Sequence, residues 1–183
     1  MRILMSFVVL SMATVTGSCA SPGAGLPPLA ATAQGPYQLG PGDQIRVTVF
    51  GLDALNNTYL VGDTGTISLP MIGTVEASGK TVAHFETDIA ESIRARQLML
   101  DPKVSAQILA YRPFFIMGEV QRPGQYPYVP GMSIMTAVSI AGGYTFRADT
   151  KAVTVTRSSA KGRASPESNV QPGDLIQVKE SWF

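Results

Sequence analysis

The stretch Gly40–Phe50, GPGDQIRVTVF, combines a tight turn with a strand. Proline holds φ at about −65° and glycine accepts positive φ, so Gly-Pro-Gly-Asp is typical of a type II turn. After the turn, Ile45, Val47 and Val49 alternate with polar residues, which predicts a strand with one buried face. This stretch therefore favours a fold built largely from strands.

A second copy of the turn lies near the other end of the sequence, in Gln171–Phe183, QPGDLIQVKESWF. Ile176 and Val178 repeat the alternation of a half-buried strand. Pro-Gly also occurs at 123–124 and 130–131, which predicts further turns of this kind and a β-rich protein. The turn residues that we single out are Pro41, Gly42, Asp43, Pro123, Gly124, Pro172, Gly173 and Asp174.

Composition and charge narrow the class of protein. The 183 residues are 45% hydrophobic, which is enough for one domain or two small ones with apolar cores. Arg2 is the only charged residue among the first 19, so the remainder carries 13 basic and 13 acidic residues. This balance predicts no bulk attraction for nucleic acid.

The first 18 residues have the features of a secretory signal peptide. Met1 and Arg2 supply positive charge, and the apolar run Ile3–Val15 follows. As a helix, this run would span about 20 Å, which is less than the hydrocarbon core of about 30 Å. We therefore predict a signal peptide at 1–18 and not a transmembrane helix.

Cys19, the only cysteine, follows small residues at the end of this run. The pattern resembles the bacterial lipobox, although Thr16 stands where leucine is usual, and the resemblance implies that Cys19 becomes a lipidated N-terminus. Ala20 and Ser21 resemble the sorting signal for the outer membrane. The alternative is ordinary signal cleavage nearby, which would leave Cys19 without a role.

Residues 20–36 carry no charge and are rich in alanine, proline and glycine, which is typical of a flexible linker. We predict a lipidated N-terminus and tether at 19–36, a first domain at 37–112 and a second at 113–183. The folded part is thus α+β and β-rich.

The first domain is expected to consist of short strands and one helix. Val82, Phe85, Ile89 and Ile93 form an apolar stripe that predicts an amphipathic helix after Gly79, with Thr81 as its N-cap. We expect strands at 44–50, 59–61, 66–69, 74–76 and 104–111.

The second domain is predicted to be a β-grasp arrangement: a hairpin, a helix and returning strands. Ser133 is the expected cap of a short helix with Ile134, Ala137, Val138 and Ala141 inward, and Gly142-Gly143 ends it. We expect strands at 114–118, 125–129, around 153–155 and at 176–178, with a polar loop at 158–169.

These residues resemble a known family. YQLGPGDQIRVTVFG, DTGTISLPMIGTVEASGKT and DPKVSAQILAY are similar to the polysaccharide export domain of bacterial capsule and exopolysaccharide export proteins. FFIMGEVQRPGQYPYVPGMSIMTAVSIAGGYT and the closing PGDLIQV are similar to the soluble-ligand-binding β-grasp (SLBB) domain that follows in that family. The resemblance covers 37–178 in the family's order. It places the two Pro-Gly-Asp turns in different domains, so the repetition reflects shared turn chemistry.

The resemblance implies an outer-membrane lipoprotein on the periplasmic side, anchored by lipid, that assembles into a homo-oligomeric ring. A new polysaccharide would pass through this ring with help from an inner-membrane chain-length regulator or co-polymerase. The best-known pore-forming relatives continue into a C-terminal amphipathic helix and have more β-grasp domains. We therefore expect a separate outer-membrane pore protein as a further partner, or a role as a periplasmic ring only.

Motifs for catalysis or cofactor binding are weak. Gly79-Lys80-Thr81 resembles the end of a P-loop, but Thr74 stands where the first glycine is required. His84 is the only histidine, no G-x-S-x-G motif occurs, and nothing favours a carboxylate pair for glycoside hydrolysis. We predict no enzyme activity, no cofactor and no metal.

Aromatic and basic residues around the domain boundary are candidates for sugar contact, because aromatic faces and guanidinium groups suit polyols and acidic groups. The candidates are Tyr111, Arg112, Phe114, Arg122, Tyr126 and Tyr128. Their alternative role is packing in the core and at solvated strand edges. A second functional hypothesis is a monomeric, membrane-tethered β-grasp module that binds a glycan or docks a partner.

Overall fold

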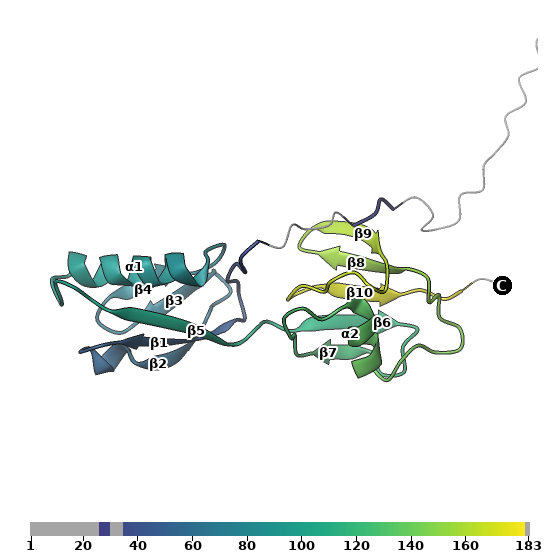
Figure 1. The fold of residues 1–183 in the computed structure, drawn as a ribbon, viewed down its shortest axis with the longest axis horizontal. Coiled ribbons are helices and arrows are strands. Elements are labelled where there is room, and N and C mark those ends of the chain that lie inside the picture. Colours follow the sequence, from purple (N-terminus) through teal and green to yellow (C-terminus); the bar gives the residue numbers. More distant parts are fainter. Residues whose placement is uncertain (1–25, 30–34, 182–183) are drawn as a thin grey trace, which may run out of the picture.

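The computed structural model describes residues 26–29 and 35–181. Figure 1 shows two units side by side along the long axis, each with strands and one α-helix. The chain crosses from the first unit to the second between β5 (Val104–Ala110) and β6 (Phe114–Gly118). The strands and helices of the two units confirm the predicted α+β, β-rich class. The predicted signal peptide and Cys19 lie outside the described residues.

The first unit has two layers. A three-stranded antiparallel sheet of order β2-β1-β5 forms one layer, and a two-stranded hairpin with α1 forms the other. β1 (Gln44–Val49) reaches β2 (Asn57–Leu60) through the 3₁₀ helix η1 (Asp53–Leu55). β3 (Thr66–Leu69) and β4 (Gly73–Glu76) make the hairpin, and α1 spans Val82–Ala95.

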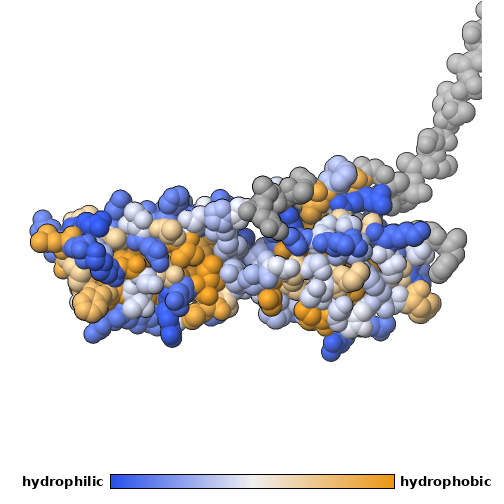
Figure 2. Space-filling view, in the orientation of Figure 1, coloured by the Kyte–Doolittle hydropathy of each residue, from blue (hydrophilic) through white to orange (hydrophobic). Residues whose placement is uncertain are grey.

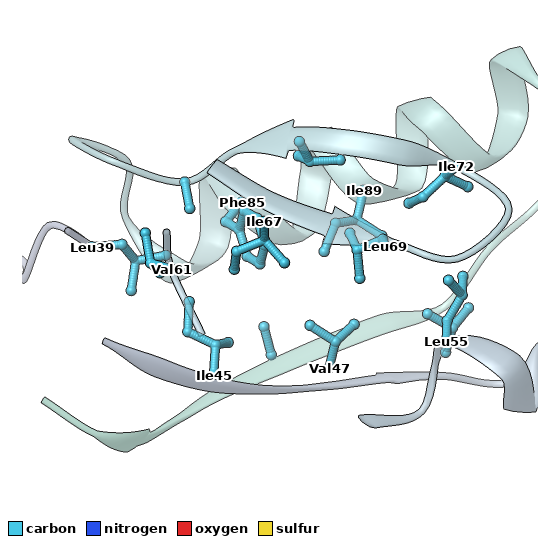
Figure 3. Close-up of a cluster of buried hydrophobic side chains, with 14 of the residues drawn as sticks. Leu39, Ile45, Val47, Leu55, Val61, Ile67, Leu69, Ile72, Phe85 and Ile89 are labelled. Atoms are coloured by element: carbon cyan, nitrogen blue, oxygen red, sulfur yellow. The ribbon is translucent and has the colours of Figure 1, made fainter. Parts of the chain in front are cut away.

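The core of the first unit lies between these layers. Figure 3 shows Ile45 and Val47 on the sheet facing Ile67 on the hairpin, with the helix beyond it. Phe85, Ile89 and Ile93 of α1 are fully buried, as the apolar stripe predicts. Thr81 caps α1, because its side chain accepts a hydrogen bond from the His84 N–H at 3.3 Å.

The second unit is a five-stranded mixed sheet of order β7-β6-β10-β8-β9. The central strand β10 (Leu175–Val178) runs parallel to β6 and antiparallel to β8 (Val153–Arg157). β7 (Gly124–Tyr126) and β9 (Ala160–Ala164) form the edges. This arrangement, with a helix between the hairpin and the returning strands, is the predicted β-grasp.

The helix of this unit, α2 (Ile134–Ile140), packs one apolar face against the sheet. The Ser133 side chain caps it by accepting a hydrogen bond from the Thr136 N–H at 3.2 Å. Ile134, Ala137, Val138 and Ala141 are all buried. The predicted cap and inward face are therefore confirmed.

Two local predictions in the second unit are wrong. The strand expected at 125–129 ends at Tyr126, because Pro127 has no N–H for a ladder. Gly124 begins β7 and is not among the glycines with positive φ, so Pro123-Gly124 does not form a turn of the Pro41-Gly42 kind. The bend lies earlier, at Gln121–Arg122.

The polar loop expected at 158–169 contains β9. In β9, the charged Lys161 and Arg163 are exposed while the small Gly162 and Ala164 are buried. The strand thus alternates without a large apolar side chain, so hydrophobic periodicity gives no signal.

Part of the predicted tether also pairs with β9. The Leu29 N–H donates to the Arg163 carbonyl at 2.6 Å, and the Arg163 N–H donates to the Pro27 carbonyl at 2.9 Å. Leu29 packs against the core of the second unit. Residues 27–29 therefore form a short added strand within the segment that the sequence presents as linker.

Candidate functional site at the junction of the two units

The two Pro-Gly-Asp turns have the same local geometry. Gly42 and Gly173 have φ of 92° and 85°, the left-handed values that a type II turn requires at its third residue. The Asp43 N–H donates to the Gly40 carbonyl at 3.1 Å, and the Asp174 N–H donates to the Gln171 carbonyl at 3.1 Å. The turns predicted at both positions are confirmed.

Both aspartates fold back over their own turn. Asp43 Oδ2 accepts a hydrogen bond from the Gly40 N–H at 2.8 Å, and Asp174 Oδ2 accepts one from the Gln171 N–H at 2.8 Å. The two residues are only 0% and 1% exposed. A buried carboxylate needs compensating donors, so each turn requires a partner from elsewhere in the chain.

Asp43 finds its partners on both sides of the domain boundary. Its carboxylate accepts hydrogen bonds from the Tyr37 hydroxyl at 2.7 Å and from the Arg112 N–H at 2.7 Å. The Arg112 guanidinium adds a charged contact, with Nη1 3.4 Å from Asp43 Oδ2. With the Gly40 N–H, four groups donate to this one carboxylate.

Arg112 lies between the two turns. Its Nε donates to the Pro172 carbonyl of the second turn at 3.1 Å, and its Nη1 donates to the Tyr37 hydroxyl at 2.9 Å. The guanidinium carbon lies 5.6 Å from the centre of the Tyr37 ring, within the range of a cation–π contact. One side chain thus binds a carboxylate in the first unit and a carbonyl in the second.

Glycines leave the room that Arg112 occupies. A Cβ on Gly40 would lie 2.2 Å from Arg112 Nη1, and a Cβ on Gly173 would lie 3.2 Å from Nε. A Cβ on Gly42 would lie 3.3 Å from the Arg112 Cβ. Because these glycines belong to the two turns, they leave room for the arginine as well as allowing the turn conformation.

Asp174 is satisfied within the second unit. Arg157, on β8, donates from Nε to Asp174 Oδ1 at 2.9 Å and from Nη2 to Oδ2 at 2.8 Å. This bidentate pair is the strong geometry for arginine and a carboxylate. The second turn is therefore tied to its own sheet, whereas the first is tied to the neighbouring unit through Arg112.

Three tyrosines complete the junction. The Tyr111 ring meets the Tyr37 ring edge-on, with centroids 4.9 Å apart, and meets the Tyr128 ring edge-on at 5.5 Å. Burial raises the pKa of the Tyr37 hydroxyl well above its ordinary value, and its hydrogen bond to Asp43 raises it further. Burial likewise raises the pKa of Tyr128. Both hydroxyls remain neutral at physiological pH.

The six residues predicted for sugar contact form two groups. Tyr111, Arg112 and Tyr128 meet at the junction, where Arg112 contacts the turn residues of both units. Phe114 is fully buried and stacks against Tyr126 with ring centroids 6.0 Å apart. Phe114 therefore offers no surface to a ligand in this conformation.

The remaining members of that set stabilise the β6–β7 hairpin. The Tyr126 hydroxyl donates to the Arg122 carbonyl at 2.6 Å, and Arg122 Nη2 donates to the Ile140 carbonyl at 3.1 Å. Tyr37 was not singled out from the sequence, and Asp43 was singled out only as a turn residue. In the sequence, Asp43 stands directly before a half-buried strand, and this position indicates that its carboxylate becomes buried.

A separate polar hollow of about 720 Å³ lies on the second unit. Lys151, Thr154, Arg163 and Gln177 line it together with Glu119, Asp149 and Glu180. These carboxylates already have partners within the chain: the Thr145 hydroxyl, the Lys151 N–H and the Arg147 guanidinium, in that order. The space suits a polar ligand better than an apolar one.

The described residues contain no group of three or more His, Cys, Asp or Glu side chains placed to hold a metal ion. Within the same ranges, no helix is both long and apolar enough to span a bilayer. Figure 2 shows apolar residues gathered on the first unit close to the junction, with mainly hydrophilic residues on the visible face of the second.

Similarity to known proteins agrees with this two-part architecture. The family of polysaccharide biosynthesis/export proteins matches residues 31–109, and the SLBB domain matches residues 113–166. The gap between the matches contains Tyr111 and Arg112, so the junction lies at the boundary of two recognised domains.

Two similar proteins carry names that concern polysaccharides. The exopolysaccharide production protein ExoF of Rhizobium meliloti (strain 1021) is 36% identical over 118 residues, which are 58% of this chain and 28% of the relative. The polysialic acid transport protein KpsD of Escherichia coli is 28% identical over 109 residues, which are 58% of this chain and 19% of the relative. The aligned part thus spans less than a third of either relative. The chain thus carries a polysaccharide biosynthesis/export domain followed by an SLBB domain, the order of domains that its sequence predicts.

Proposed function

We propose that this protein is a periplasm-facing component of a polysaccharide export machine, anchored in the outer membrane through lipid on Cys19. It forms, or contributes to, a ring-shaped conduit for the polymer. The export domain followed by an SLBB domain supports this proposal, as does the similarity to an exopolysaccharide production protein and a polysialic acid transport protein.

The observation that carries the proposal is the Arg112 junction. A ring needs subunits of constant shape, because each interface must meet the next at the same angle for the ring to close. Arg112 joins the Asp43 carboxylate of the export domain to the Pro172 carbonyl of the SLBB domain. This link supports a subunit in which the two domains keep one relative orientation.

Exposed apolar residues near the junction supply a surface for self-association. Leu60 is 60% exposed on β2 opposite Gln44, and Leu109 is 50% exposed on β5. Both strands flank β1, so these leucines belong to one end of the sheet. Exposed apolar surface of this kind marks interaction sites when it is contiguous.

The family is one of transport and export and not a family of enzymes. We propose that this protein likewise performs no chemical step on its cargo. Its expected partners are the polysaccharide, further copies of itself, an inner-membrane chain-length regulator and a separate outer-membrane pore protein.

A monomeric, membrane-tethered binding module is the second candidate function. The polar hollow on the second unit favours it, because its lining of cations, carboxylates and polar side chains suits a polyhydroxyl ligand. This candidate predicts saturable glycan binding by a single copy, whereas the conduit predicts a closed oligomer.

Native and denatured masses of the full-length protein, extracted from membranes in mild detergent, test these alternatives. We expect a denatured mass that corresponds to a chain starting at acylated Cys19, and a native mass of several subunits. A monomer would overturn the self-sufficient ring and favour the binding module. An unacylated chain would overturn the lipid anchor.

A further inference from the structure

The sheet of the second unit has one face opposite α2, across the strands β9, β8, β10 and β6 that lie side by side in Figure 1. The residues on either side of Thr154 in β8 belong to the core with α2, so Thr154 points to the opposite face. Strand pairing places Arg163 of β9 and Gln177 of β10 beside Thr154, and Met117 of β6 beside Gln177. We call these four side chains the open-face row.

All members of the open-face row except Met117 line the polar hollow of about 720 Å³. Two further segments that line it are joined to each other by backbone hydrogen bonds. The Asp149 N–H donates to the Lys179 carbonyl at 2.8 Å, and the Ser181 N–H donates to the Arg147 carbonyl at 2.7 Å. The hollow is therefore bounded by a sheet face and by a pair of segments that hold one another in place.

Thr154 is the unusual member of the lining. It is only 2% exposed, and its hydroxyl makes no hydrogen bond with any other residue that the structure describes. Because Thr154 lines the hollow, the small surface that it keeps faces this space. A buried hydroxyl without a partner is costly, and a ligand that supplies the missing hydrogen bond removes the cost. Thr154 thus indicates a ligand in the hollow.

The other polar residues of the lining indicate the chemical class of this ligand. The donors are Lys151, Arg163 and Lys179, and the charged acceptors are Glu119, Asp149 and Glu180. A simple anion would meet three carboxylates, and an apolar molecule would leave both kinds of group without hydrogen bonds. A hydroxyl donates and accepts, so a polyhydroxyl ligand can bind both kinds at once.

An apolar strip extends the same face beyond the hollow. Phe115 and Met117 are each 43% exposed, and they pair with Leu175 and Gln177 of the neighbouring strand β10. Adjacent strands lie about 5 Å apart, so the strip begins directly beside the open end of the row. An aromatic ring and a thioether offer apolar surface on which the C–H face of a sugar ring can pack.

We propose that this face of the SLBB domain binds a segment of polysaccharide. The hydroxyls of one sugar residue enter the hollow at Thr154 and Gln177, and the next residue packs on Phe115 and Met117. The proposal rests on the proposed function, which supplies the polymer, and it gives each copy of the chain a contact with its cargo. This site is separate from the Arg112 junction.

A pair of threonine variants tests the hollow in the full-length protein extracted in mild detergent. The probes are oligosaccharides obtained by partial hydrolysis of the polysaccharide that the producing cells secrete, and calorimetry measures their binding. We expect Thr154→Val to weaken binding about tenfold or more without lowering the midpoint of thermal unfolding, because the hydroxyl has no partner in the described chain. The matched control is Thr156→Val, two residues along the same strand face and outside the hollow, which should bind as the wild type does.

Three outcomes would overturn the proposal. They are no binding by the wild type, equal affinities of the two valine variants, and a lowered unfolding midpoint for Thr154→Val, which would assign the hydroxyl a structural role.

Cross-linking in cells that produce the polysaccharide tests the apolar strip. The photoreactive residue p-benzoylphenylalanine in place of Met117 should give an adduct of protein and carbohydrate on irradiation. The same residue in place of Glu91, which is exposed on α1, should give at least tenfold less. Equal yields, or no adduct at position 117 while export continues, would overturn this inference alone. Export that is unchanged when the whole chain is deleted would instead overturn the proposed function.

Discussion

Each of the two Pro-Gly-Asp turns ends in a buried aspartate, yet the arginines that bind these aspartates come from different parts of the fold. Asp174 binds Arg157, 17 residues away on a strand of the same sheet. Asp43 binds Arg112, 69 residues away in the connection between the two units. One turn therefore stabilises its own domain, and the other also joins two domains.

This difference teaches that a repeated motif can share a local structure without sharing a tertiary role. In both turns the aspartate accepts a hydrogen bond from the N–H of the first turn residue. This contact depends only on four consecutive residues. The burial of the carboxylate then creates a demand for a cation. Which arginine binds the carboxylate depends on which segment the fold places beside the turn.

The largest expected effect follows the removal of either carboxylate. We expect Asp43→Ala and Asp174→Ala each to lower the free energy of unfolding by about 3–5 kcal/mol, since each leaves a partly buried arginine without its carboxylate and a backbone N–H without its acceptor. Hydrogen exchange resolved by peptide should show exchange in both units for Asp43→Ala and mainly in the second for Asp174→Ala. The exposed Glu91→Ala on α1 is the control. Identical exchange maps for the two aspartate variants would contradict the comparison.

Removal of Arg112 should distinguish the two roles of the first turn, which stabilises its own domain and also joins the two domains. Arg112→Met keeps the backbone N–H that binds Asp43, so we expect a smaller loss of about 1–3 kcal/mol. The variant loses the contact with Pro172, and we expect small-angle scattering to show a broader range of distances between the units. Arg157→Met is the matched control, because it should destabilise the second unit and leave the scattering profile unchanged. An unchanged profile for Arg112→Met would show that other contacts hold the junction.

A methyl group at the first turn should displace Arg112 without removing it. Gly40→Ala places a Cβ against the guanidinium, and we expect a loss of about 1–2 kcal/mol as the side chain shifts from Asp43. Gly124→Ala and Gly35→Ala meet no atom within 4 Å and should be nearly neutral. Thermal unfolding with circular dichroism measures the difference. A neutral Gly40→Ala variant would mean that the guanidinium adjusts at no cost.

The smallest effect concerns alkaline pH. The Tyr37 pKa is raised in the folded protein, so the unfolded chain loses this proton first as pH rises past 10.0. Stability from this group is therefore complete below pH 10 and falls as pH rises above it. We expect the free energy of unfolding of the wild type to fall more steeply with pH than that of Tyr37→Phe. Urea unfolding from pH 8 to 11 measures both. Parallel curves for the two proteins would contradict this role of Tyr37.

Much of the fold was predictable because its signals are local. The strands at 66–69 and 114–118, the Thr81 and Ser133 caps and the inward face of α2 agree with the structure. Each depends on residues within a few positions of one another. The resemblance to export proteins added the order of the two domains.

Two of the errors, at β9 and at residues 27–29, share a physical cause. β9 and the added strand have little apolar periodicity, and they are strands because a neighbouring backbone supplies hydrogen bonds. Sugar contact by Arg112 stays a prediction, because an arginine beside tyrosines also suits sugar binding. Its contacts with Asp43 and Pro172 depend on the approach of two domains.

The sequence by itself determined the two turns, because proline and glycine restrict φ within four residues wherever the chain goes. It also determined which strand faces are apolar, and hence that two cores form. Only the tertiary structure decided that Asp43 binds an arginine across the domain boundary and that residues 27–29 complete the sheet of the second domain. Those outcomes depend on distances between segments far apart in sequence, which no local preference encodes.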